Sequence, residues 1–508
     1  MRLIRHPLAL LAASFLVACS GAESSTGPNV PPTPPAPLAV PSIAREFRGM
    51  WIATVANIDW PSRAGLSTTQ QQNELTAILD MAQLAGLNAV ILQVRASGDA
   101  LYQSALEPWA KSIMGVQGVD PGYDPLAYAV TAAHARGLEL HAWFNPFRAG
   151  NLSDTLTLAP LHFARRRPDV TRRYCTQLWF DPGAQAVHDQ AIAVVTDVIA
   201  RYDIDAVHLD DFFYPYPDSR CPSLDFPDSA TYAAYTANGG TLGRADWRRD
   251  NTNRFVERLY ATVHSASPSV RVGISPFGIW RPGNPTGITG LDAYGSIYAD
   301  SKHWLQRGWV DYFAPQLYWS TSSTGQNFSA LLGWWAQQNA LKRHLWPGLA
   351  SYRVNDGSSS AYAATEIPAQ ITLTRQQAAA SGYFAGSVLY NTTSIKNDVG
   401  GVRSLLTAGV YGAPALPPPS TWLDNTPPAA PSVAVTAVGS SLRVSITPIG
   451  SDLLAWHLVR WRTNGAWAQK TLSSASRSID VTAAGVDGVV VNAIDRVGNA
   501  SVDVVWRP

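Results

Sequence analysis

The 508-residue sequence has little net charge and few cysteines, and both shortages exclude classes of protein. Its formal net charge is +1 and only 15% of its residues are charged, so we expect no nucleic-acid partner. The three cysteines are Cys19, Cys175 and Cys221. So few soft ligands argue against a metal site, and we expect no cofactor. Cys175 and Cys221 could form a disulfide in an oxidising compartment, although their spacing leaves this open.

Three motifs of common enzymes are also missing. No Gly-x-Ser-x-Gly elbow is present, which disfavours a serine hydrolase of the usual kind. The zinc motif His-Glu-x-x-His is absent as well. No Gly-x-Gly-x-x-Gly follows the first predicted strand, which counts against a dinucleotide-binding fold.

The N-terminus carries an apolar run that is too short to cross a bilayer. Arg2 and Arg5 precede this run, which predicts a signal peptide over residues 1–18. The run ends in Leu-Val-Ala before Cys19, which resembles the lipobox of bacterial lipoproteins. The resemblance implies cleavage before Cys19 and its acylation, for example with palmitate. Because Ser20 follows rather than an acidic residue, we expect an anchor in the outer membrane, facing the periplasm. An ordinary signal peptide with a chance cysteine is the alternative.

Two proline-rich segments divide the mature chain. Residues 19–44 form a Pro/Ser-rich tether without periodicity, and residues 416–430 form a second linker. Residues 431–508 hold seven short runs of alternating hydrophobicity, which predict a small all-β sandwich similar to fibronectin type III or Ig-like modules. We expect this domain to act as a spacer, with glycan binding through Trp461 or Trp467 as the alternative.

Residues 45–415 alternate short β-rich runs with helical patterns. Strands are predicted at residues 48–55, 88–95, 139–146, 206–213, 271–278, 311–319, 345–351 and 386–391. Helices are predicted at residues 69–85, 125–136, 184–202, 245–265, 302–307, 331–340, 366–380 and 395–408. Eight such repeats predict an α/β fold in which a parallel sheet closes into a (β/α)₈ TIM barrel, with an open doubly wound sheet as the alternative.

The fourth predicted strand carries the main catalytic candidate. Active sites of (β/α)₈ barrels lie at the C-terminal ends of the strands. Alternation along this strand points Val207 and Leu209 at the surrounding helices, and His208 and Asp210 at the barrel axis. Asp210 lies near the C-terminal end of the strand, where a buried carboxylate indicates a functional role. With Asp211 beside it and aromatic residues following, the segment indicates a carbohydrate site.

A glycosidase normally needs two carboxyl groups. We favour Asp210 as one of them. The candidates for the second are Asp211, Asp59, Glu107, Asp181 and Asp300. Asp311 opens the sixth strand at the opposite end of the barrel, so we expect it to have a structural role.

Other strands place polar side chains at the same end of the barrel. They are Gln93, Arg95, His141, Trp143, Asn145, Gln316, Tyr318, Tyr390 and Asn391. Convergence of such groups on one mouth is typical of a ligand site. Arg95 could hold a carboxylate ionised or bind a substrate anion.

Several of these segments together resemble one protein family. They are REFRGMWIATVANIDWPS, ILQVRASGDALYQSALEPW, GYDPLAYAVTAAHARGLELHAWFNPFR, LWFDPG, VHLDDFFYP, GISPFGIWRPG and GWVDYFAPQLYW. They look like the glycosyl-hydrolase-like family 10 of bacterial lipoproteins, from about Arg45 to Asn391. The resemblance implies a (β/α)₈ barrel that hydrolyses glycans. For some relatives it implies action on peptidoglycan strands that lack stem peptides.

The resemblance also supplies site residues. The matching positions are Asp59, Trp60, Gln93, Arg95, Tyr102, Asn145, Asp210, Asp211, Arg281, Gln316 and Tyr318. We add Tyr214 and Asn391 as substrate-binding candidates, and we expect Asp211 or Asp59 to partner Asp210. Arg95, Arg148 or Arg281 could face the carboxylates of muramic acid.

Two other functions remain as alternatives. The chain could be a glycan-binding lipoprotein without a working acid/base pair, which would lack two carboxyl groups within roughly 5 to 10 Å at the strand ends. It could also be a metal-dependent polysaccharide deacetylase that uses His141 and His208 with Asp210.

Overall fold

The computed structural model describes residues 38–508. The predicted signal peptide, Cys19 and most of the predicted tether therefore lie outside the described residues. Ser42–Pro508 forms one compact unit, which contains the predicted barrel and β-sandwich regions. None of the helices in this part of the chain has the length and hydropathy needed to cross a membrane.

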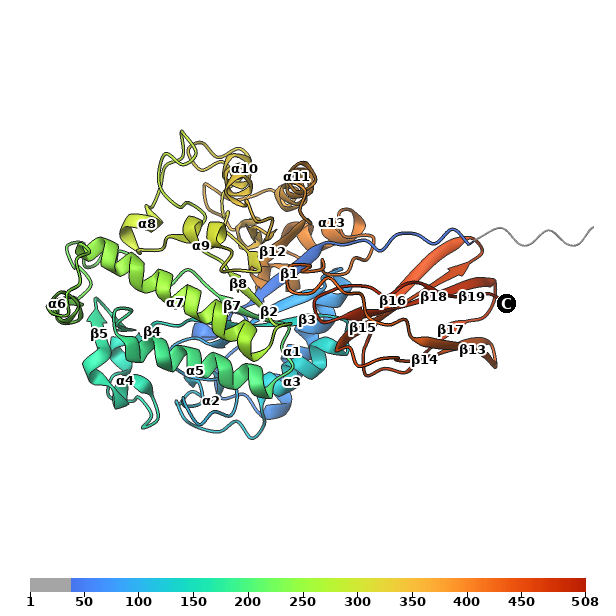
Figure 1. The fold of residues 1–508 in the computed structure, drawn as a ribbon, viewed down its shortest axis with the longest axis horizontal. Coiled ribbons are helices and arrows are strands. Elements are labelled where there is room, and N and C mark those ends of the chain that lie inside the picture. Colours follow the sequence, from blue (N-terminus) through green and yellow to red (C-terminus); the bar gives the residue numbers. More distant parts are fainter. Residues whose placement is uncertain (1–37) are drawn as a thin grey trace, which may run out of the picture. The chain divides into compact units, whose positions relative to one another are not determined.

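Nine parallel strands form one curled sheet at the centre of this unit (Figure 1). Their order across the sheet is β10-β9-β8-β7-β3-β2-β1-β12-β11. The strands are β1 (Phe47–Ile52), β2 (Ala89–Arg95), β3 (Glu139–Phe144), β7 (Ala206–Leu209), β8 (Arg271–Ile274), β9 (Tyr312–Phe313), β10 (His344–Leu345), β11 (Gly348–Ala350) and β12 (Gly386–Tyr390). Each predicted strand segment is present, although most strands are shorter than predicted.

The two ends of this sheet belong to one chain segment. β10 pairs with β9 and β11 pairs with β12, and only Trp346 and Pro347 separate β10 from β11. Pro347 has no N–H group to donate, so the ladder is interrupted there. The bonding resumes at once, because the N–H of Gly348 donates to the carbonyl of Pro315 at 2.9 Å. The sheet therefore curls until its first and last strands lie end to end.

Helices cover the outside of the sheet, and α5 and α7 pack side by side (Figure 1). The main helices are α1 (Thr68–Leu84), α3 (Pro125–His134), α5 (Gln185–Arg201), α7 (Arg244–Ala266), α9 (Ser301–Arg307), α10 (Phe328–Gln338), α11 (Glu366–Ser381), α12 (Thr392–Lys396) and α13 (Val402–Ala408). The single helix predicted at 395–408 is wrong. Asp398, Gly400 and Gly401 have φ values of 48°, 60° and 79°, and left-handed residues end a right-handed helix.

Alternation along the strands separates two apolar layers. Trp51 and Tyr312 belong to a cluster inside the curled sheet, whereas Val207 and Leu209 pack in the larger cluster against the helices, as predicted. Gly273 makes room for the inner layer, because a Cβ atom at this position would lie 1.9 Å from the Tyr312 ring.

The long connections after β2, β3, β7 and β8 carry further elements. A small antiparallel sheet contains β4 (Arg148–Asn151), β5 (Thr171–Tyr174) and β6 (Gln177–Phe180). The short helices in the loops are α2 (Lys111–Met114), α4 (Phe163–Arg166), α6 (Ser229–Ala237) and α8 (Ala293–Ser296). A disulfide joins Cys175, beside β5, to Cys221 in the connection that follows β7. It ties two of the loops above the sheet together.

The C-terminal region is all-β, as its alternating pattern predicts. Its two antiparallel sheets have the orders β13-β14-β17 and β16-β15-β18-β19. The strands are β13 (Ser432–Val438), β14 (Ser441–Thr447), β15 (Leu454–Thr463), β16 (Ala466–Ser473), β17 (Ser478–Thr482), β18 (Val486–Asp495) and β19 (Val504–Trp506). Valines of both sheets share one core, and Trp461 packs against it.

Contacts connect this region, and the segment that precedes it, to the N-terminal ends of the parallel strands. Arg496 forms ion pairs with Asp203, at 2.6 Å, and with Asp205, at 3.5 Å. The indole N–H of Trp422 donates to Asp311 at 2.8 Å, and Asp311 also accepts from the backbone N–H of Val272. Asp311 thus serves as a structural residue, at the end of the sheet opposite Asp210.

Candidate active site

Asp210 lies directly after β7, with its carboxyl group held by three neighbours. The Trp143 indole N–H donates to it at 3.0 Å, the Asn145 amide at 2.9 Å and the Phe212 backbone N–H at 3.1 Å. Burial and the charge of Asp211 raise the pKa of Asp210 to about 6, against the lowering effect of these donors. Asp210 can therefore hold or release a proton near neutral pH.

Asp211 is the second carboxyl group at this point. The Tyr216 hydroxyl donates to it, and Gln316 is a further hydrogen-bond donor. Burial raises the pKa of Asp211 above its usual value, and those hydrogen bonds and the positive charge of Arg148 offset only part of this rise. Because Asp210 and Asp211 repel each other when both are ionised, their protons are released in two coupled steps.

Both carboxyl groups open into one cleft of about 260 Å³. Seven aromatic side chains line it, namely Trp51, Trp143, Phe212, Tyr216, Phe277, Tyr318 and Tyr390. The rings of Tyr318 and Tyr390 are stacked, with centroids 5.9 Å apart. Ser275 and Gln316 add polar groups. Aromatic faces with a few directed polar groups suit a sugar ring.

Two histidines below the cleft form a buried hydrogen-bond chain. His141 and His208 each contact the Tyr312 hydroxyl through Nδ1 at 2.9 Å. Nε2 of His141 contacts Glu139, and Nε2 of His208 accepts from the Trp51 indole at 3.1 Å. All four ring nitrogens are thus engaged. Among residues 38–508, no group of three or more His, Cys, Asp and Glu residues is placed to hold a metal ion. The geometry does not favour the deacetylase alternative.

The other carboxylates considered as partners for Asp210 serve to hold loops. Asp59 accepts from the Ala53 backbone N–H at 2.9 Å and from the Thr393 backbone N–H, in α12, at 3.2 Å. Glu107 forms an ion pair with Arg95, and Asp181 forms one with Arg172 at 2.7 Å. Asp300 caps α9. Of the described residues that line the cleft, none is from this group.

Two residues predicted to bind substrate support the cleft from below instead. The Gln93 side chain accepts from two backbone N–H groups of the loop after β1, at 3.0 and 2.8 Å. Arg95 is 1% exposed and makes a two-point contact with Glu107, with one N–O distance of 2.7 Å. It also donates to the carbonyl of Asn145. Arg95 therefore positions Asn145, and it is not free to bind a substrate anion.

Five more predicted binding residues lie elsewhere. Trp60 and Tyr102 are buried in the core beneath the helices. Tyr214 borders a separate cavity of about 220 Å³. Arg281 is partly exposed and forms an ion pair in its own loop. Asn391 caps α12 with its side chain, whereas the preceding residue, Tyr390, lines the cleft.

The structure adds cleft residues that the sequence did not single out. They are Trp51, Tyr216, Ser275 and Phe277. Trp51 could have been found from alternation, because it faces the axis at the C-terminal end of β1. Tyr216 and Phe277 lie in loops, where no periodicity predicts the direction of a side chain.

The chain matches one protein family and several known proteins. The model of the family described as Glycosyl hydrolase-like 10 matches residues 46–363. The chain is 41% identical to "Glycosyl hydrolase YngK" of Bacillus subtilis (strain 168) over 411 residues, which cover 78% of this chain and 79% of that protein. It is 35% identical to "Glycosyl hydrolase DigH" of Escherichia coli (strain K12) over 380 residues, or 70% of this chain and 84% of that protein.

Solved structures of lower similarity were also found. The glycoside hydrolase domain of PgaB (BpsB) from Bordetella bronchiseptica is 13% identical, with a TM-score of 0.47 over 72% of this chain and 98% of that domain. The catalytic domain of β-amylase from Paenibacillus polymyxa is 14% identical, with a TM-score of 0.44 over 70% of this chain and 94% of that domain.

Proposed function

We propose, given that the chain belongs to the glycosyl hydrolase-like 10 family and is a glycosyl hydrolase, that it cleaves peptidoglycan glycan strands that lack stem peptides. The observation that carries this proposal is the pair of buried carboxyl groups, Asp210 and Asp211, in one aromatic cleft. We interpret the curled sheet as a (β/α)₈ barrel whose active site is this cleft.

The two carboxyl groups take different roles in this proposal. Asp210 donates a proton to the leaving oxygen, because its pKa of about 6 leaves it partly protonated near neutral pH. Asp211 acts in its ionised form as base or nucleophile, supported by Tyr216, Gln316 and the charge of Arg148. Trp143 and Asn145 fix the Asp210 carboxyl group while the aromatic side chains hold the sugar.

The substrate follows from the family resemblance together with the predicted place of the protein. Residues 1–18 and Cys19 predict export and lipid attachment, which would hold the enzyme beside the peptidoglycan layer. The C-terminal β domain serves in this proposal as a fibronectin type III-like spacer.

The catalytic proposal is tested with Asp210→Asn, which keeps the size of the side chain and removes its proton. We expect hydrolysis of peptide-free glycan strands to fall at least 1,000-fold, which corresponds to about 4 kcal/mol of transition-state stabilisation. Products are measured by mass spectrometry, and the thermal unfolding midpoint checks the fold. Asp300→Asn is the matched control, because Asp300 caps α9 away from the cleft. Full turnover by Asp210→Asn would refute the assignment.

The anchor is tested separately from the chemistry. We expect the protein to incorporate labelled palmitate and to fractionate with outer membranes, whereas Cys19→Ser should abolish both. Cys175→Ser is the control, because this cysteine is engaged in the disulfide. Wild-type protein that carries no palmitate label and remains in the soluble fraction would favour the alternative, an ordinary signal peptide with a chance cysteine.

A further inference from the structure

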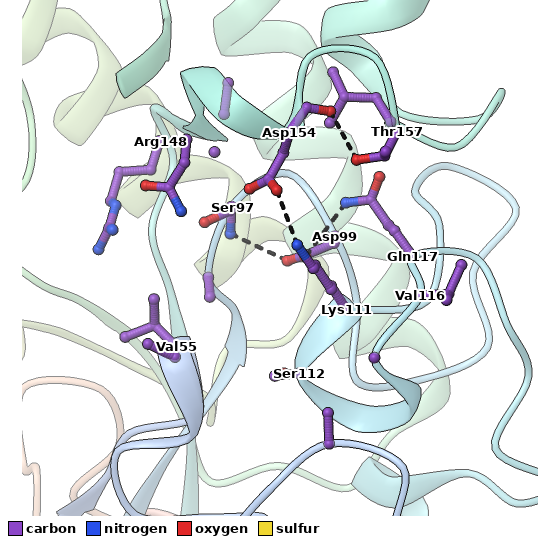
Figure 2. Close-up of a pocket in the computed structure, with 18 of the residues that line it drawn as sticks. Val55, Ser97, Asp99, Lys111, Ser112, Val116, Gln117, Arg148, Asp154 and Thr157 are labelled. Carbon is purple, nitrogen blue, oxygen red and sulfur yellow. Dashed lines mark hydrogen bonds and ion pairs between the residues drawn. The ribbon is translucent and has the colours of Figure 1, made fainter. Parts of the chain in front are cut away.

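A second hollow lies above the strands, between the loops that follow β1, β2 and β3 (Figure 2). Its volume is about 700 Å³, and three chain segments line it, within residues 55–64, 96–117 and 148–158. We call it the loop cavity. The roles proposed above for Asp210, Asp211 and the aromatic cleft make no use of it.

The lining of the loop cavity differs from that of the cleft. Among the described residues that line it, none is aromatic. Lys111 and Asp154 form an ion pair at 2.9 Å, which joins the second loop to the third. The Gln117 amide points toward Asp99 (Figure 2), with 3.5 Å between the atoms. Such a lining offers hydrogen bonds to hydroxyl and amide groups rather than a stacking surface for a ring.

Arg148 connects the loop cavity with the cleft. It lines the cavity, and its guanidinium lies 5.1 Å from the ring centre of Phe212, which lines the cleft. Its charge acts on Asp99 in the cavity and on Asp210 in the cleft. The Arg148 side chain forms neither a hydrogen bond nor an ion pair with another described residue, so its N–H donors remain available to a ligand.

The two volumes indicate how a substrate could be divided between these hollows. Pockets for small ligands measure roughly 300–1,000 Å³, so the cleft of about 260 Å³ is small even for one such ligand. The loop cavity of about 700 Å³ is well within this range. A chain of sugars bound with one unit in the cleft would extend past Arg148.

We propose that the loop cavity binds further sugar units of the same glycan chain whose scissile unit lies at Asp210 and Asp211. This inference rests on the proposed function. The hydroxyl and amide groups of these sugars form hydrogen bonds with Asp99, Gln117 and the Lys111–Asp154 pair. The small apolar side chains of the wall, such as Val55 and Ala64, leave room for N-acetyl methyl groups. The enzyme therefore selects oligosaccharides over single sugars or disaccharides.

The test measures binding by calorimetry, with the Asp210→Asn protein as background so that the ligand is not consumed. The ligands are a disaccharide and a hexasaccharide of peptide-free peptidoglycan glycan. We expect the hexasaccharide to bind at least tenfold more tightly. Ala64→Phe, which fills the loop cavity, should remove most of this difference, and Lys111→Ala should weaken hexasaccharide binding about threefold. Affinity for the disaccharide should stay the same in both variants.

Matched controls carry the same substitutions at exposed positions outside both hollows. Ala340→Phe and Lys470→Ala should leave both affinities unchanged. Equal affinity for the two ligands, or an unchanged hexasaccharide affinity in Ala64→Phe, would overturn this inference and leave the proposed function standing. Failure of both ligands to bind would contradict the proposed substrate, and the inference with it.

Discussion

Asp210 owes its chemistry to its surroundings rather than to its residue type. An exposed aspartate is ionised at neutral pH, but burial and the neighbouring Asp211 raise the pKa of Asp210 to about 6. Three hydrogen-bond donors limit this rise and fix the direction of the carboxyl group. Arg148 opposes the rise as well, because a positive charge favours ionised carboxylates nearby.

This arrangement predicts the pH dependence of hydrolysis. A proton donor works only in its protonated form, so kcat/KM should fall as the pH rises through about 6. Arg148→Gln removes a charge that favours ionisation, so the pKa of the carboxyl pair should rise. The alkaline limb of the profile should then move upward, by about one pH unit. The measurement is initial rate against pH on peptide-free glycan strands.

The control for this prediction is Arg167→Gln, which removes an exposed arginine paired with Asp169. Its pH profile should match that of the wild type. An Arg148→Gln profile with an unchanged alkaline limb would show that Asp210 does not supply the catalytic proton.

At the scale of elements, the loops above the sheet depend on buried ion pairs and hydrogen bonds. Arg95 ends β2 and joins Glu107 in the following loop to the carbonyl of Asn145 after β3. Asp59 links the loop after β1 to α12. These contacts hold the strand ends that carry the cleft residues in fixed relative positions.

The Arg95–Glu107 pair should therefore be important for stability. Glu107→Gln leaves the guanidinium of Arg95 buried without a charged partner, which typically costs about 3–5 kcal/mol. We expect a loss of this size in the free energy of unfolding, measured by denaturant titration. Asp480→Asn breaks an exposed pair with Arg443 and should leave the unfolding midpoint unchanged. Equal midpoints for the two variants would contradict the prediction.

For the whole molecule, the contact between the β domain and the parallel sheet should depend on pH. Burial raises the pKa of Asp205, but the charges of His134 and Arg496 and several hydrogen bonds outweigh it, and the pKa lies well below its usual range. A carboxyl group with a depressed pKa in the folded state stabilises the fold above its unfolded pKa of about 4. This stabilisation declines as the pH falls below that value, and it is lost as the pH falls through the depressed pKa of the folded state.

Arg496→Ala should accordingly reduce stability at neutral pH more than in acid. We expect its thermal midpoint to lie below that of the wild type at pH 7, and the difference to narrow only in strong acid, where the pH reaches the depressed pKa of Asp205 in the folded state. Arg462→Ala is the control within the same domain, because its pair with Asp487 is partly exposed and does not involve Asp205. Equal midpoints for Arg496→Ala and the wild type at pH 7 would contradict the prediction.

The sequence by itself determined the order of strands and helices, the all-β C-terminal region and the direction of His208 and Asp210. These features follow from periodicity along a few consecutive residues, which a sequence displays directly. The broken helix at 395–408 is an exception, because its pattern did not reveal the left-handed residues Asp398 and Gly400.

Only the tertiary structure decided which carboxyl groups meet. Asp211 shares the cleft with Asp210, whereas Asp59, Glu107 and Asp181 are occupied by loop contacts. Arg95 likewise proved to be paired below the cleft, and the loop cavity was not foreseen. The physical reason is that these side chains stand in loops or at strand ends, where their partners come from residues distant in the sequence. Which partner each one meets is fixed by the curl of the sheet and by the packing of its loops.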